Sequence, residues 1–317
     1  MTTHLEHDEP VVHMGLPLPD GKLAMWLFLV TEIMFFTGLI GMYIVLRQSA
    51  PVHEGKSLWP TPHDVHLAEI WGAVNTFVLI CSSLTVVLAH WALGKGQVSK
   101  ALGYVGVTLA LGVVFLAIKA YEYKAKWDHS IIPGYVGDHL DPHSRFYSDA
   151  IAFQYKDRVK AQLKHLVENP QAAHVNPDSA AFKEARELAL QIQAIAPEKS
   201  AGGEATQEVP PLPDSTPPLE VGHRVNELMH KAEEEGVPLH LSPYVPYGNL
   251  WASCYFAMTG FHALHVLGGL VVFVIILILA ALGRFGPQNE MFLELTGLYW
   301  HFVDIVWIFL FPLLYLV

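Results

Sequence analysis

The stretch from Leu250 to Leu282 reads LWASCYFAMTGFHALHVLGGLVVFVIILILAAL and decides the fold class. It contains no Asp, Glu, Lys or Arg. A helix needs about 20 residues to cross the hydrocarbon core of a membrane, at a rise of about 1.5 Å per residue. The apolar side chains lie nearly all round such a helix, whereas a soluble helix has a polar stripe every 3.6 residues. The stretch therefore predicts a membrane-spanning helix.

Four further stretches have the same character, and apolar residues make up 52% of the chain. These stretches are Lys22–Leu46, Leu67–Leu93, Ala101–Tyr123 and Leu295–Val317. We therefore predict an all-α membrane protein with five transmembrane helices in a bundle. The predicted division is an exposed N-terminal arm at 1–21, helices 1–3 within 22–123, an extramembrane insertion at 124–248, and helices 4 and 5 within 249–317.

The insertion between the third and fourth spans is far longer than a connection between two membrane helices needs. Apolar residues recur every four positions in parts of it, which is typical of amphipathic helices. The predicted helices cover 147–168, 179–196 and 221–235. Residues 197–218 are rich in Pro, Gly, Glu and Ser, which favours a linker.

Composition excludes several classes of function. The net charge of −11 argues against nucleic-acid binding. The two cysteines, Cys81 and Cys254, each lie inside a predicted span, so they form neither a disulfide framework nor a zinc site. The chain has no Cys-x-x-Cys-His sequence, which excludes covalent c-type haem. The insertion holds eight of the eighteen histidines, but they are scattered, and we expect no metal and no redox cofactor on this chain.

Basic residues in the short loops predict the orientation of the chain in the membrane. One side carries Lys22, Lys95, Lys100 and Arg284, whereas the other short loop has only Arg47 and Lys56. This favours a cytoplasmic N-terminus, although Lys119, Lys124 and Lys126 on the opposite side count against it. The first 21 residues lack the features of a signal peptide. With five spans, the insertion and Val317 would then face the periplasm.

Glu32 lies near the predicted midplane of the first span, where an ionised carboxylate is costly. One interpretation is a neutral carboxylic acid that is hydrogen-bonded to a neighbouring helix. The other is a proton-linked or conformational site, because carboxyl groups inside membranes are often functional. The residues alone leave both interpretations open.

Five other ionisable residues lie in the spans, namely Glu122, His262, His265, His301 and Asp304. The two pairs that are three residues apart share a helical face and could in principle bind a metal. The di-iron pattern Glu-x-x-His is absent, however, and we prefer hydrogen bonds between helices. Equal depth predicts that His265 or His262 forms one polar cluster with Asp304, with Glu32 nearby. We expect Trp251, Trp300 and Trp307 to serve packing rather than a cofactor.

Several segments resemble the cytochrome c oxidase subunit III family in order and spacing. They are WLFLVTEIMFFTGL at 26–39, TGFHALHVLGG at 259–269 and YWHFVDIVWIFLF at 299–311, supported by NTFVLICSS at 75–83, AHWAL at 89–93 and YEY at 121–123. The resemblance covers essentially all of the membrane part. Many family members have seven spans, and this chain begins where their third would start. The resemblance does not extend to the insertion.

The resemblance implies roles for individual residues. Glu32 is similar to the family's carbodiimide-reactive membrane carboxyl group. The motif residues His262, His265, His301 and Asp304 are similar to family residues that support helix packing rather than bind metal. Asn75, Trp300 and Trp307 match packing positions of the motifs. The family binds phospholipid between its helices, and its haem and copper belong to other subunits. The partners implied are oxidase subunits I and II, with cytochrome c or another respiratory complex expected at 124–248.

The resemblance thus implies a non-redox core subunit of a proton-translocating terminal oxidase in the bacterial inner membrane, which stabilises the catalytic subunit and supports proton uptake. Within the superfamily, subunit III of a quinol oxidase and the homologue that accompanies nitric oxide reductase remain alternatives. A stand-alone transporter, from a different class, predicts an internal repeat and broken helices, and we find neither in the sequence.

Overall fold

The computed structural model describes residues 19–53, 56–140, 148–171, 175–192 and 217–317. The predicted N-terminal arm up to residue 18 and most of the predicted linker at 197–218 lie outside these ranges. The five predicted spans are confirmed as helices long and apolar enough to cross a membrane. They are α1 (Asp20–Ser49), α2 (Glu69–Gly94), α3 (Val98–Asp128), α7 (Gly248–Ala281) and α8 (Glu290–Tyr315), the last preceded by the short 3-10 helix η1 (Pro287–Asn289).

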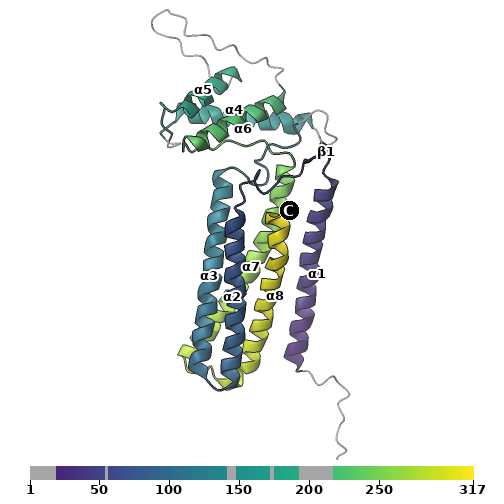
Figure 1. Cartoon of the computed structure of the whole chain (residues 1–317), viewed down its shortest axis with the longest axis vertical. Helices are drawn as coiled ribbons and strands as arrows, with labels where there is room; N and C mark the ends of the chain where they lie inside the picture. The colour runs from purple at the N-terminus through teal and green to yellow at the C-terminus, as the bar shows by residue number, and fades with distance from the viewer. Residues whose placement is uncertain (1–18, 54–55, 141–147, 172–174, 193–216) are drawn as a thin grey trace, which may run out of the picture.

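The spanning helices run side by side (Figure 1). Helix α2 packs against α3 and α8, while α7 packs against α3 and α8, so these four helices form a closed bundle. Helix α1 stands at one side of the bundle and packs on α7 and α8 (Figure 1). The predicted all-helical membrane fold is therefore confirmed.

Helix α1 touches the bundle through a narrow stripe. Its buried residues are Leu29, Phe36 and Tyr43, which are spaced by seven positions. A heptad spacing keeps one seam of a helix against its partner. Apolar side chains elsewhere on the helix stay exposed, including Leu27 and Met34. Most of the apolar surface of α1 is thus available to lipid or to another subunit.

Trp300 on α8 joins all four helices of the bundle and is 1% exposed. Its indole Nε1 donates a hydrogen bond to the Ser82 hydroxyl of α2 at 2.9 Å. The ring lies against Gly112 of α3 and Gly269 of α7, where a Cβ atom would come within 2.9 Å and 2.6 Å of ring carbons. The two glycines therefore create the space that the indole fills.

The described part of the insertion contains three helices with a core of their own, and this core is separate from that of the bundle. Helix α4 (Asp149–Glu168) and helix α6 (Pro218–Glu234) lie near the predicted helices at 147–168 and 221–235. Helix α5 (Ala180–Gln191) ends before the predicted helix at 179–196. Their apolar faces meet through residues such as Val159, Phe182 and Leu228.

The insertion covers one end of the bundle (Figure 1). The Asn249 side chain at the start of α7 donates to the Val136 carbonyl at 2.7 Å and to Asp138 at 3.0 Å. Gly137 and Tyr244 form an isolated parallel bridge beside them. A hairpin of two short strands, β1 (Val52–His53) and β2 (Lys56–Ser57), follows α1 at the same end and was not predicted. The C-terminus also lies there (Figure 1).

The close contact between Trp300 and Gly269 predicts that a larger residue at position 269 destabilises the bundle. Replacing a helix glycine by alanine normally stabilises a protein by about 0.5–1 kcal/mol, because glycine loses more backbone entropy on folding. At Gly269 the added methyl group would collide with the indole, so we expect Gly269→Ala to lower the free energy of unfolding by about 1 to 2 kcal/mol. Gly260→Ala on the same helix is the control, since its nearest atom, the Tyr123 hydroxyl, is 4.0 Å away. The measurement is the midpoint of unfolding in a detergent titration. Equal midpoints for the two variants would contradict the account.

Candidate functional site

The structure places five of the six predicted intramembrane polar residues in three separate sites, and His262 lies outside them. Glu32 and His265 form one, His301 forms the second with Ser83, and Glu122 forms the third with Lys119. Among the described residues, no hydrogen bond joins one site to another. The single cluster expected from equal depth is therefore corrected. Residues at the same depth lie on different faces of their helices, and depth alone does not distinguish these faces.

The first site joins α1 to α7 near the middle of both helices. The Glu32 carboxyl Oε2 lies 3.0 Å from His265 Nε2. The other ring nitrogen, Nδ1, lies 2.7 Å from the Phe261 carbonyl. From α8, the Tyr299 hydroxyl donates to the His265 carbonyl at 3.0 Å. Phe36 of the α1 stripe packs edge-on to the imidazole ring at 5.2 Å.

The hydrogen bonds of His265 orient its ring between the two helices. A carbonyl oxygen only accepts hydrogen bonds, so the contact with Phe261 makes His265 Nδ1 the donor. Nε2 then faces the Glu32 carboxyl group, and a proton lying between them would leave the pair without net charge, which suits an apolar surrounding. The pair therefore joins α1 to α7 near the middle of both helices.

The second site joins α2 to α8. The Ser83 hydroxyl lies 2.5 Å from His301 Nδ1, and Asp304 is buried on the next turn of α8. The Asp304 Oδ1 atom has no hydrogen-bond partner in the described part of the chain. Nearer the C-terminal end of α8, Trp307 Nε1 donates to the Thr76 hydroxyl at 2.9 Å.

Two residues with predicted roles are buried without a hydrogen bond. His262 is 1% exposed, and both its ring nitrogens lack partners among the described residues. It packs instead against Phe115 and Trp307, with ring centroids 5.6 and 5.1 Å away. The expectation that His262 hydrogen-bonds to another helix is therefore corrected in favour of His265. Asn75 is also 1% exposed, and its side-chain amide has no hydrogen-bond partner among the described residues.

The third site is a buried ion pair near the insertion end of the bundle. Lys119 Nζ donates to Glu122 at 2.9 Å and to the hydroxyls of Tyr255 and Tyr315 at 3.0 and 2.9 Å. Both tyrosine hydroxyls also donate to the Glu122 carboxylate. Lys119 is 3% exposed. All three protons of its ammonium group have acceptors, and α3, α7 and α8 are joined by one network.

Lys119 is the residue that sequence reasoning missed, because it was counted there as a loop charge. The signal that could have found it is its spacing of three from Glu122, which places a lysine and a carboxylate on one helical face. Lys126, one turn beyond the pair, is likewise buried and donates to the Val65 carbonyl.

Five spanning helices joined by buried polar pairs define a polytopic membrane protein whose polar groups mainly hold helices together. The family model for cytochrome c oxidase subunit III matches residues 2–138 and 238–317. The chain belongs to the cytochrome c oxidase subunit III family. It is therefore a multi-pass membrane subunit of a haem-copper oxidase, associated with the other subunits of a respiratory complex.

Individual relatives agree with the family. The chain is 25% identical to "Probable cytochrome c oxidase subunit 3" of Nocardia farcinica over 291 residues, which is 92% of this chain and 85% of the relative. It is 24% identical to "Cytochrome c oxidase subunit 3" of Corynebacterium diphtheriae over 290 residues, covering 92% and 84%. A shorter match to the Synechocystis subunit is 46% identical over 69 residues, 22% of this chain and 30% of that one. The two long alignments extend across the insertion, whereas the family model passes over residues 139–237.

The second prediction concerns the contribution of the buried Lys119–Glu122 ion pair to stability. Lys119→Met leaves the Glu122 carboxylate without its cation, and breaking one partner of a buried pair costs about 3–5 kcal/mol. Replacing both residues, as Lys119→Met with Glu122→Gln, removes both charges and should restore most of the lost stability. The measurement is a double-mutant cycle on the midpoint of unfolding in detergent. A double variant whose loss equals the sum of the two single losses would show that the residues do not interact.

Proposed function

We propose that this chain is the non-catalytic, non-redox core subunit III of a bacterial terminal oxidase. In this proposal it stabilises the catalytic subunit and supports proton uptake, while subunits I and II carry the haem and copper. The composition supports the absence of covalent haem, since the chain has no Cys-x-x-Cys-His sequence. The relatives bear the name of the cytochrome c enzyme, which favours cytochrome c over quinol as the electron donor of the complex.

The observation that carries the proposal is the Glu32–His265 pair. A proton shared by the two groups would lie near the middle of both helices, and both side chains keep some exposure, 21% for Glu32 and 16% for His265. The pair also fastens α1 to α7, so its loss would loosen the helix that offers the widest apolar surface. The same surface of α1 suits acyl chains of a structural phospholipid or a helix of a partner subunit. The spanning helices run unbroken through their midpoints, a feature that does not favour a transporter.

The insertion is the part of the chain that we propose to contact cytochrome c or another respiratory complex. Its three helices add a folded surface at one end of the bundle, beyond what connects α3 to α7 (Figure 1). That surface is available because the helices have their own core and do not depend on the membrane.

The third prediction concerns Glu32 during turnover. Glu32→Gln keeps one hydrogen-bonding side chain for His265, so we expect normal assembly and nearly normal oxygen reduction. Glu32→Ala leaves the partly buried His265 imidazole nitrogen unpaired, at up to about 1–3 kcal/mol, and should loosen α1 and hasten inactivation during turnover. The measurement is oxygen consumption over many turnovers, with haem spectra of each purified complex as the control. Immediate and complete loss of activity in Glu32→Gln, with haems and subunits in place, would show that the carboxyl group itself performs an essential step.

We further propose that the N-terminus is cytoplasmic, with the insertion and the C-terminus in the periplasm. The environment of two lysines supports this orientation. Lys119 is ion-paired inside the bundle and Lys126 is buried, so neither counts as a loop charge on the insertion side. The basic residues of the opposite loops then outnumber those of the short loop after α1.

The fourth prediction tests this orientation with single cysteines at exposed positions. Glu187→Cys lies in the insertion and Lys100→Cys lies at the start of α3, at the other end of the bundle. In cells with a permeabilised outer membrane, an impermeant maleimide should label Glu187→Cys and leave Lys100→Cys unlabelled until the inner membrane is broken. The chain without added cysteines is the control for Cys81 and Cys254. The reverse pattern of labelling would invert the proposed topology.

A further inference from the structure

A cleft separates the insertion from the end of the bundle. Its volume is about 440 Å³, and its walls come from the loop before α2, the end of α3, and α6 with the segment that follows. Histidine and carboxylate side chains line it, and the function proposed above uses none of them. The cleft lies between two parts of the chain that have separate hydrophobic cores.

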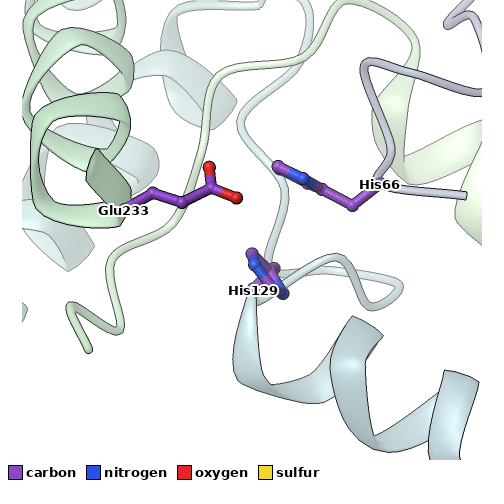
Figure 2. A group of neighbouring side chains, drawn as sticks. All are labelled: His66, His129 and Glu233. Atoms are coloured by element: carbon purple, nitrogen blue, oxygen red, sulfur yellow. The ribbon is translucent and has the colours of Figure 1, made fainter. Parts of the chain in front are cut away.

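Three of these side chains converge, His66, His129 and Glu233 (Figure 2). Each offers one nitrogen or oxygen atom, and all these atoms lie within 4.8 Å of one another. Ligands around a tetrahedral zinc ion, bound at about 2.0–2.1 Å, are about 3.3 Å apart. Small side-chain rotations would close the remaining difference, because His66 and Glu233 are exposed and His129 is only partly buried.

His129 has the hydrogen bond that is typical of a metal-binding histidine. It follows the last residue of α3, and its Nδ1 lies 2.7 Å from the Ala125 carbonyl. The carbonyl can only accept, so Nδ1 carries the proton and Nε2 keeps a free lone pair. Histidine ligands of metals usually donate their second ring N–H to such a backbone carbonyl, which fixes the tautomer and the orientation of the ring.

His66 is held in place at a cost to its backbone. Its φ of 50° lies in the left-handed region, which costs a non-glycine residue about 1–3 kcal/mol. In this conformation its ring stacks on that of His129, with centroids 4.5 Å apart.

Glu233 supplies the negative charge from the last turn of α6. No ion pair or hydrogen bond within the described chain occupies its carboxylate, whereas the neighbouring Glu234 lies 3.6 Å from His230. Two imidazole nitrogens and one carboxylate oxygen make a donor set that suits Zn²⁺, with a fourth position left for water.

We propose that His66, His129 and Glu233 bind one divalent ion of the zinc type, which fastens the insertion to the membrane bundle. Two of the ligands belong to the bundle side and one to α6, so the ion would join parts that are otherwise connected by a few hydrogen bonds. The site is distinct from the intramembrane polar pairs and does not depend on the proposed role of Glu32.

The fifth prediction tests the site on the purified oxidase complex, first freed of loosely bound metal with a chelator. Equilibrium dialysis against Zn²⁺ should find one more ion per complex in the wild type than in His129→Ala or Glu233→Gln. We expect each variant to weaken zinc binding at this site at least about tenfold. Zinc bound elsewhere in the complex cancels in the comparison. Glu227→Gln on α6 and His165→Ala on α4 are matched controls and should bind as the wild type does.

A second readout follows the insertion itself. Added zinc should slow hydrogen exchange in residues 218–240 of the wild type, and it should leave this exchange unchanged in Glu233→Gln. Haem spectra and subunit content show that each variant has assembled. Glu233 is exposed, so its replacement preserves the fold even if His129→Ala disturbs the end of α3. Equal zinc binding in the wild type and Glu233→Gln, or an equal loss in the controls, would overturn the proposal.

Discussion

The bundle depends on one close contact, the indole of Trp300 lying on the bare backbone of two glycines. Because Gly112 and Gly269 have no side chains, α3 and α7 can both lie close to the indole ring. The Ser82 hydroxyl of α2 accepts the hydrogen bond from the indole N–H. In lipid, helices gain little from burying apolar surface against each other, so association rests on close packing and on hydrogen bonds. Trp300 provides both at one point. The packing of α2, α3, α7 and α8 against one another depends on this contact.

The intramembrane polar side chains also hold the helices together. Each of the three intramembrane sites links different helices, with α1 to α7, α2 to α8, and α3 to both α7 and α8. A buried charge is tolerated where its partners meet every donor and acceptor, as at Lys119 and Glu122. His262 shows the other solution, since it lies among aromatic rings and makes no hydrogen bond in the described structure. Helix α8 takes part in most of these contacts, in keeping with its central place.

The sequence predicted the spans because length and the absence of charge are sufficient evidence for a membrane helix. It also predicted the insertion and its three helices, from the spacing of apolar residues. The sequence could not show whether His262 or His265 is the partner of Glu32, because the two histidines are three residues apart and lie on the same side of the helix. Lys119 was hidden by its distance from the apolar centre of the span. The group His66, His129 and Glu233 comes from three distant segments, and no local pattern records that they meet.

The narrow attachment of α1 has a consequence for biosynthesis. Helix α1 is made first, but the helices it packs on, α7 and α8, begin about 200 residues after it ends. At roughly 5–20 residues per second, that interval lasts roughly 10–40 seconds. Helices α2 and α3 are consecutive and pack on each other, so they can pair before α7 and α8 are made, whereas α1 must wait for its partners in the chain. Throughout this wait Glu32 has no histidine within the chain to hydrogen-bond with, and an ionised carboxylate would be costly inside the membrane. The nascent chain therefore passes through a stage in which its first helix has been made but is not yet docked on α7, and the synthesis of His265 supplies the missing partner.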